Sequence, residues 1–331
     1  MSAFNIKNIT LLQIMRKYGI VIILILLIAV LGIISPVFLS ANNIFNILAQ
    51  TSIFGIMALG MTFVIISRGI DLSVGSVLAF SGVVAATLGQ VSDATIKFFP
   101  NLPVMPVIVP ILAALLIGAA CGSVSGFFIA KTKIPPFIAT LGMMTLARGL
   151  ALIFTNGRPV SGLIPGITFL GSNIFGRIPV PVVIYFVMIV ISYILLNKTR
   201  FGKNVYAIGG NITAAEVSGV NVPKNIILIY TYCGLLAGLA ALVFMGRVGA
   251  ISPGAADGFE LTAIAATTIG GTSHSGGIGT IGGAFVGALV LSVLRNGFTL
   301  LGVSPHWQRV AEGIIIVAAV IIDMRKNAKR E

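Results

Sequence analysis

Residues 47–67 read ILAQTSIFGIMALGMTFVIIS, and none of these side chains is charged. A helix rises about 1.5 Å per residue, so roughly 20 apolar residues cover the ~30 Å hydrocarbon core of a bilayer. A run of this length and composition is typical of a membrane-spanning helix. The segment therefore predicts an all-α membrane protein whose solvent is lipid.

The rest of the chain repeats this pattern. Hydrophobic residues make up 57% of the 331 residues and charged residues only 9%, with a mean hydropathy of +1.09. A soluble domain carries about 25% charged residues, so this composition excludes a soluble protein. We predict one polytopic transmembrane domain over residues 1–331, with about ten helices. The predicted spans are 18–35, 47–67, 72–91, 104–130, 135–156, 178–196, 226–246, 257–272, 278–297 and 307–323.

The loop charges predict the orientation of the chain. The net charge of +13 is spread between the apolar runs and does not form one tract, so it does not indicate nucleic-acid binding. Basic residues gather in the tail 1–17, the loop 197–225 and the tail 324–331, which the positive-inside rule places in the cytoplasm. The basic start and the run 18–34 resemble a signal peptide. Because that run is long and residues 35–37 form no cleavage site, we expect a retained first helix.

Two glycine-rich breaks interrupt the apolar pattern, at Arg68–Ser76 and Gly270–Gly279. Broken helices at corresponding positions of two halves are typical of a transport pathway, and ordinary turns between packed helices are the alternative. The similarity suggests a parallel repeat. The apolar run before the second break is too short for a full span, so we expect unwound backbone there that protein or a water-filled cavity satisfies. The pathway candidates are Asp71, Ser73, Gly75, Gly270, Gly271 and Ser273.

Few charged residues are expected at membrane depth, where they are costly and usually functional. Arg148 is the deepest cation, and its interpretation is either a structural or snorkelling side chain or a part of the pathway. Asp71 is expected to pair with Arg68 or to cap the next helix, and Arg309 is expected to pair with Glu312. No span carries Asp, Glu and His together as a proton relay, which counts against an ion-coupled carrier.

No motif indicates an enzyme or a metal centre. His274 and His306 have no second histidine at metal-binding spacing, and the chain has neither a Walker A motif nor a G-x-S-x-G elbow. Cys121 and Cys233 lie in apolar runs without Cys-x-x-Cys spacing, so we interpret them as small packing residues.

The longest cytoplasmic connection, 197–225, carries the strongest functional pattern. A basic lead is followed by Gly209-Gly210-Asn211, interpreted as the entry turn of a helix, and by a short amphipathic stretch that ends at Gly219. We predict a short surface helix on which a partner protein acts. A loop helix without a partner is the alternative.

Thr213-Ala214-Ala215-x-x-x-Gly219 resembles the EAA-x3-Gly loop by which importer permeases of the ATP-binding-cassette class engage their ATPase, with Thr in the position of Glu. This resemblance marks the segment as the ATPase-coupling region. The coupling candidates are Gly209, Gly210, Asn211, Thr213, Ala214, Ala215, Glu216 and Gly219.

Along nearly its full length the chain resembles the ribose/galactoside/xylose permease family of bacterial sugar importers. So many matches in one order make a specific signal, although each segment alone is weak. The matching segments are Asn42–Leu48, Gly69–Ser76, Pro136–Gly142, Arg200–Lys203, Ala207–Asn211, Ser218–Asn221, Glu260–Ala266, Gly270–Ser273, Ser275–Gly279 and Gly302–Pro305.

The resemblance implies a type II-like importer permease of the bacterial inner membrane that carries ribose, galactose or a similar monosaccharide. It implies a second permease copy, a cytoplasmic ATPase that uses ATP and Mg, and an external sugar-binding protein, while the chain itself binds no cofactor. An ion-coupled carrier or channel and a structural membrane protein are the alternatives. The candidates for contact with the binding protein are Arg158, Arg247, Asp257 and Glu260.

Overall fold

The structure is a computed structural model that describes residues 11–327, and it is mostly helical. Residues 1–10 and 328–331 of the expected tails 1–17 and 324–331 therefore lie outside the described part. The helices are α1 Leu11–Ile34, α2 Ala41–Ile66, α3 Val74–Leu88, α4 Ile108–Thr132, α5 Pro136–Thr155, α6 Pro165–Thr168, α7 Val180–Lys198, α8 Arg200–Gly210, α9 Ile212–Val217, α10 Val222–Val248, α11 Phe259–Ile269, α12 Ile281–Leu300 and α13 Pro305–Asn327, with a 3-10 turn at Phe169–Gly171.

Six of the described helices are long and apolar enough to cross a membrane, namely α2, α4, α5, α7, α10 and α12. The other expected spans differ from this simple form. The apolar part of α1 covers Gly19–Ile34, and α3 and α11 have only 15 and 11 residues. Both short helices adjoin the glycine-rich breaks, so the breaks occupy part of the expected spans 72–91 and 257–272 as non-helical backbone.

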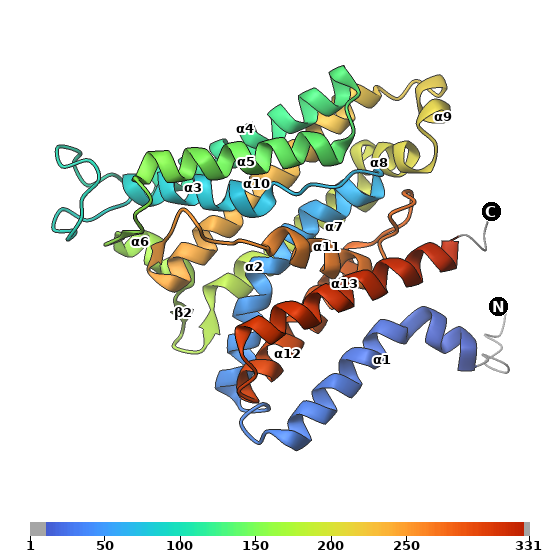
Figure 1. Cartoon of the computed structure of the whole chain (residues 1–331), viewed down its shortest axis with the longest axis horizontal. Coiled ribbons are helices and arrows are strands. Elements are labelled where there is room, and N and C mark those ends of the chain that lie inside the picture. Colours follow the sequence, from blue (N-terminus) through green and yellow to red (C-terminus); the bar gives the residue numbers. More distant parts are fainter. Residues whose placement is uncertain (1–10, 328–331) are drawn as a thin grey trace.

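Helix α2 lies in the middle of the bundle. It packs against α7, α10, α11 and α12, and nearly all of its side chains from Thr51 to Ile66 are fully buried. Figure 1 shows α4 and α5 on one flank of this helix and α1, α12 and α13 on the opposite flank. A helix that is apolar on all sides belongs in such an interior position, because every face of it meets other protein.

Helices α4 and α10 form the tightest pair. Gly118, Gly122 and Gly126 recur every four residues along α4 and face the backbone of α10. A Cβ atom at Gly126 would lie 2.9 Å from the Cα atom of Ile227, closer than real side chains approach. The run of small residues thus allows two helix backbones to touch, as small residues do in membrane bundles.

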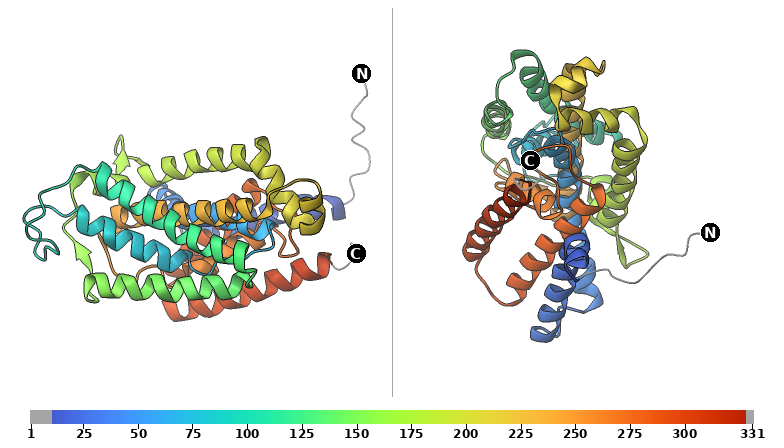
Figure 2. Two further views of the ribbon diagram at one scale, coloured as in Figure 1. Left: turned by 90° about the horizontal axis from the view of Figure 1, so that it is seen from above. Right: turned by 90° about the vertical axis from the view of Figure 1, so that its right-hand side faces the viewer.

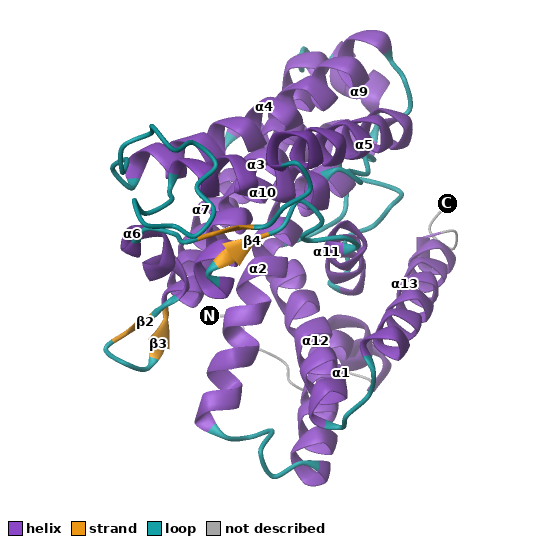
Figure 3. Cartoon of the chain, turned by 60° about the vertical axis from the view of Figure 1, so that its left-hand side comes forward, coloured by secondary structure: helices purple, strands orange, loops and turns teal. Residues whose placement is uncertain are grey.

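The two ends of the bundle are formed by different elements. The start of α1, the end of α13 and helices α8 and α9 lie at one end, and the loop 89–107, α6 and the β2–β3 hairpin lie at the other (Figures 1 and 2). Figure 3 shows that this hairpin projects from the helices. The strands are β1 Val160–Ser161, β2 Asn173–Ile174, β3 Ile178–Pro179 and β4 Ala250–Ile251, and β1 pairs with β4 in antiparallel register.

The segment 197–225 contains two helices instead of the single one expected. Gly209 and Gly210 do not form an entry turn but end α8, and Asn211 caps α9 by accepting a hydrogen bond from the Ala214 amide. Helix α8 begins at Arg200 because Thr199 caps it through the Gly202 amide. Two glycines stay helical here because tertiary packing offsets their weak helix propensity.

Candidate functional site

Helix α9 holds four of the eight coupling candidates and presents three of them to solvent. Thr213, Ala214 and Glu216 are exposed, and the neighbouring apolar Val217 is 86% exposed. Ala215 faces inward and packs against Ile208 of α8 and Val222 of α10. An exposed helix that carries small and apolar side chains with a single charged one, Glu216, is suited to docking against another protein, since most of its contact area requires no desolvation of charge. Gly219 closes the segment in the left-handed region that favours glycine.

The end of α8 is joined to the end of α2 through Arg68. Its Nε atom donates to the carbonyl of Gly209 at 2.7 Å, and its Nη2 atom donates to the carbonyl of Gly210 at 2.8 Å. These are terminal carbonyls of α8, which have no intrahelical partner and carry the negative end of the helix dipole. Arg68 has φ of 63°, a strained value for a residue with a side chain, and such strain is typical of functional positions.

The second glycine-rich break also contacts the ends of α2 and α8. The Gly277 amide donates to the carbonyl of Ile66 at 2.8 Å, and the Tyr206 hydroxyl of α8 donates to the carbonyl of Gly279 at 2.8 Å. Burial raises the pKa of the Tyr206 phenol, so it stays protonated and donates at neutral pH. A Cβ atom at Gly209 would overlap the Ile66 carbonyl oxygen. We name this contact between α2, α8 and the loop 270–280 the α8 joint.

Helix α13 holds the other side of that loop. A carboxylate oxygen of Asp323 accepts hydrogen bonds from the Ser273 hydroxyl at 3.2 Å and from the His274 amide at 3.1 Å. The His274 ring in turn bonds to the Thr268 hydroxyl at 2.8 Å. The pathway candidate Ser273 is therefore buried and bonded to α13, and the next residue, His274, is bonded to both α13 and α11.

The first group of pathway candidates lies in packed protein at the start of α3. Asp71 is 1% exposed, and one of its oxygens accepts from the amide and hydroxyl of Ser73 at 2.8 and 2.6 Å. The other carboxylate oxygen has no hydrogen-bond partner among the described residues. The expected pair with Arg68 is wrong, because Arg68 is turned toward α8. The expected cap of α3 is present only in the form of the bond to the Ser73 amide.

Glycines at both breaks allow close helix contacts. A Cβ atom at Gly75 would meet the carbonyl oxygen of Ala256 and the carboxylate of Glu260, and one at Gly270 would meet Gly283 of α12. Gly271 has a positive φ of 86° and faces open space. Within the described part of the chain, no hydrogen bond joins the candidates of the first break to those of the second. The second break instead contacts the end of α2, where the Gly277 amide donates to the carbonyl of Ile66 just before the first break.

The outer candidates occupy different environments. Arg158 is exposed, and Asp257 is exposed opposite Arg309 at 3.9 Å. Arg247 donates to the side-chain oxygen of Asn46, whereas Glu260 is partly buried beside Gly75. Of the four candidates, Arg158 and Asp257 thus present the most accessible charges.

Two charged groups within the helices have other partners than expected. Arg309 does not pair with Glu312, because the Glu312 carboxylate binds the Arg295 guanidinium, with Nη2 and Oε2 at 2.7 Å. Sequence reasoning missed Arg295, although its opposite charge within a neighbouring predicted span was the available signal. The Arg295 guanidinium also lies 4.4 Å from the ring centroid of Phe54, a cation–π contact.

Arg148 anchors the loop between β4 and α11. Its Nη1 atom donates to the carbonyls of Pro253 and Ala255 at 2.7 and 2.8 Å. This geometry favours the structural interpretation of Arg148. Cys121 and Cys233 are buried and unpaired, as expected of packing residues, and no cluster of three metal-ligating side chains occurs in residues 11–327.

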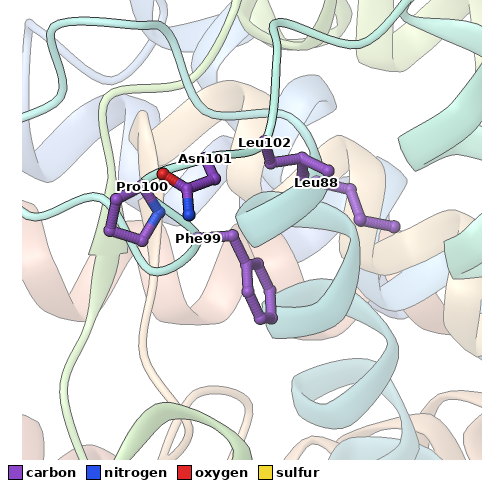
Figure 4. Close-up of a pocket in the computed structure, with 5 residues that line it drawn as sticks. All are labelled: Leu88, Phe99, Pro100, Asn101 and Leu102. Carbon is purple, nitrogen blue, oxygen red and sulfur yellow. The ribbon is translucent and has the colours of Figure 1, made fainter.

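A 480 Å³ surface pocket lies at the end of the bundle opposite α8 and α9, between α3 and the loop that follows (Figure 4). Its lining is mainly apolar and includes none of the candidates. The lining residues are Leu88, Phe99, Pro100, Asn101 and Leu102.

Comparison with known proteins shows which family the chain resembles along its length. A family model described as "Branched-chain amino acid transport system / permease component" matches residues 43–320. The ribose import permease protein of Escherichia coli (strain K12) is 44% identical over 92% of this chain and 93% of its own length, and that of Bacillus subtilis (strain 168) is 43% identical over 95% of both. The galactose/methyl galactoside import permease protein of Escherichia coli (strain K12) is 38% identical over the full length of both chains. No solved structure matches the chain.

Proposed function

The chain belongs to the permease component family of branched-chain amino acid transport systems and their relatives, and we propose that it is the membrane subunit of an ATP-driven importer for a monosaccharide. The observation that carries the proposal is full-length similarity, at 38–44% identity, to permeases that import ribose and galactose or methyl galactoside. Such relatives are permeases and not enzymes. The sugar is ribose, galactose or a close relative of these.

We propose ten passages of the membrane, with both ends of the chain in the cytoplasm of a bacterial inner membrane. Six full-length helices support six of the passages. Helices α1 and α13 add two, and α3 and α11 add two more when each is counted with the break beside it. An even number returns the chain to its starting side. The basic loop 197–225 then lies in the cytoplasm, as the positive-inside rule requires.

The proposed assembly contains two copies of this chain, a cytoplasmic ATPase and an external sugar-binding protein. The ATPase uses ATP and Mg, and this chain supplies no cofactor site. Helix α9 supports the docking of the ATPase, since Ala214, Glu216 and Val217 are exposed beside a buried Ala215. The exposed Arg158 and Asp257 support contact with the binding protein at the outer end.

The α8 joint supports a route for mechanical coupling. Closure of the ATPases would move α9 and, through the shared packing of Ala215 and Ile208, would move α8. Arg68 and Gly277 would pass that movement to α2 and to the loop 270–280. Since these elements adjoin the two breaks, the movement would alternate access to a path between the two copies.

Co-purification tests this proposal. The tagged chain is extracted from its native membrane, and we expect an ATPase in stoichiometric amount. Ala214→Arg places a charge on the exposed face of α9 without disturbing its buried side, and we expect it to remove the ATPase. Asn101→Arg is the matched control at the exposed outer end. An ATPase retained by the Ala214→Arg variant would contradict docking at α9.

Reconstitution separates the importer from its alternatives. The proposal requires that sugar uptake into proteoliposomes depends on the ATPase, the binding protein and ATP. Uptake by the chain alone, driven by a proton or sodium gradient, would establish the ion-coupled carrier instead. A structural membrane protein would show neither activity.

A further inference from the structure

Two adjoining surface depressions lie at the α8 end of the bundle, between the exposed faces of α4 and α10. The first has a volume of 250 Å³ and the second 410 Å³, and Ile227 lines both. The first is lined by Lys131, Asn221, Pro223, Lys224, Ile227 and Leu228, and the second by Ser123, Val124, Phe127, Phe128 and Ile227. Because Ile227 borders both, we name the two depressions together the α4–α10 groove.

The mouth of this groove is positively charged. Lys131 lies in the last turn of α4 and Lys224 in the first turn of α10, and both side chains are exposed. Neither ammonium group has a hydrogen bond or an ion pair with any residue in the described part of the chain. No acidic residue lines either depression. The mouth therefore has two cationic donors that are available to an anion.

The rest of the groove is apolar and runs toward the membrane interior. Phe128 and Ser123 precede Lys131 by three and eight residues, which corresponds to roughly 5–12 Å of depth along α4. Val124, Phe127 and Phe128 remain 43–49% exposed there. The hydroxyl of Ser123, the one polar side chain in this part, is satisfied by Thr231 and by the Ala119 carbonyl.

We propose that the α4–α10 groove binds one anionic phospholipid of the cytoplasmic leaflet. Its phosphate lies between Lys131 and Lys224, and an acyl chain covers Phe127, Phe128 and Ile227. The cytoplasmic leaflet is negatively charged, and basic pockets between spanning helices on that side suit anionic head groups. A soluble anion would contact only the two lysines, whereas a phospholipid would also cover the apolar part of the groove with an acyl chain. The choice of leaflet rests on the proposed orientation.

The position of the groove connects the lipid to coupling. Asn221 lines the mouth and caps α10, and the adjacent Val220 and Val222 pack with Ala215 of α9. A head group at this place borders the helix on which the ATPase is proposed to dock. The bound lipid would therefore stabilise the α9–α10 turn in its docking geometry.

Lipid retention tests the inference without measuring transport. The purified full-length chain is equilibrated in nanodiscs of phosphatidylcholine with one-third phosphatidylglycerol, then exchanged into mild detergent. Retained phosphatidylglycerol is counted by mass spectrometry. We expect about one molecule per chain, and about tenfold less for the double variant Lys131→Gln/Lys224→Gln. Val124→Trp, which fills the floor and keeps both charges, is expected to reduce retention several-fold.

The controls make each outcome decisive. Lys198→Gln/Lys203→Gln removes the same charge from the same end without touching the groove and should retain the lipid within twofold. Equal loss in both double variants would overturn the site in favour of general surface charge. Displacement of the lipid by millimolar inorganic phosphate would overturn the phospholipid in favour of a free anion, and undiminished retention in Val124→Trp would overturn the acyl-chain contact with the groove. Because none of these readouts involves sugar or ATP, they stand apart from a failure of the importer proposal.

Discussion

Two neighbouring helices, α4 and α5, use glycine in opposite ways. On α4, a Cβ atom at Gly118, Gly122 or Gly126 would meet the backbone of α10. On α5, Gly142 and Gly149 would accept a Cβ atom with nothing within 4 Å. The first set of glycines is required by packing inside the chain, and the second lies on an open face.

The open face of α5 is a shallow groove of 690 Å³ along the helix. Its lining is apolar except for Thr145, and it includes both open glycines. The contrast with α4 shows that the residue type alone does not reveal the role of a glycine in a membrane helix. The neighbouring backbone decides it.

The largest effect on folding should come from the face of α4 that packs against α10. Gly122→Leu forces α4 and α10 apart, since even a Cβ atom would overlap the Tyr230 carbonyl oxygen. We expect loss of most folded protein after detergent extraction, measured by size-exclusion chromatography. Gly122→Ala should lower stability by roughly 2 kcal/mol, the usual size of an overpacking defect. Recovery of Gly122→Leu at the wild-type level would mean that α4 and α10 tolerate separation at Gly122 without loss of the fold.

The next effect separates two adjacent glycines at the α8 joint. Gly209→Ala introduces a methyl group against the Ile66 carbonyl, whereas the same change at Gly210 meets no atom within 4 Å. We expect ATP-driven uptake to fall more than tenfold for Gly209→Ala, with the chain still folded, and to fall less than twofold for Gly210→Ala. Equal effects of the two substitutions would exclude close packing at the joint as the cause.

A smaller effect is expected from the side chain that closes this joint. Arg68→Gly removes the bonds to the Gly209 and Gly210 carbonyls but also relieves a strained backbone, whose φ of 63° suits glycine. We expect thermal stability near the wild-type value and uptake reduced several-fold relative to ATP hydrolysis. Arg68→Lys should preserve part of the coupling through a single donor. Unchanged sugar-to-ATP stoichiometry in both variants would remove Arg68 from the coupling route.

The smallest effect on stability should come from the open face. Gly142→Ala adds a methyl group in open space on a helix and should change stability by less than about 1 kcal/mol, in the favourable direction. The measurement is a thermal melt of the purified chain beside Gly122→Ala. A destabilisation as large as that of Gly122→Ala would show that a second surface covers this face in the purified protein.

The length of the apolar runs predicted the spanning helices well where each helix is continuous and long enough to cross the membrane. The runs that became α2, α4, α5, α7, α10 and α12 are long enough to be recognised without knowledge of their neighbours. The segments beside the breaks were harder, because α3 and α11 are short and continue as non-helical backbone. The resemblance of Thr213–Gly219 to a coupling loop located α9, but α8 was missed since its last two residues are glycines.

Composition and periodicity by themselves determined the lipid environment, the helical class and the charge asymmetry, because each depends on local properties of the chain. The partners of the charged residues were decided only by tertiary structure. Arg68 binds carbonyls 141 and 142 residues away, and Arg295 binds Glu312, where the nearer Arg309 was expected. Such pairs depend on which helix faces meet, and in a bundle of similarly apolar helices that choice is made by close packing of small residues and by burial of charge.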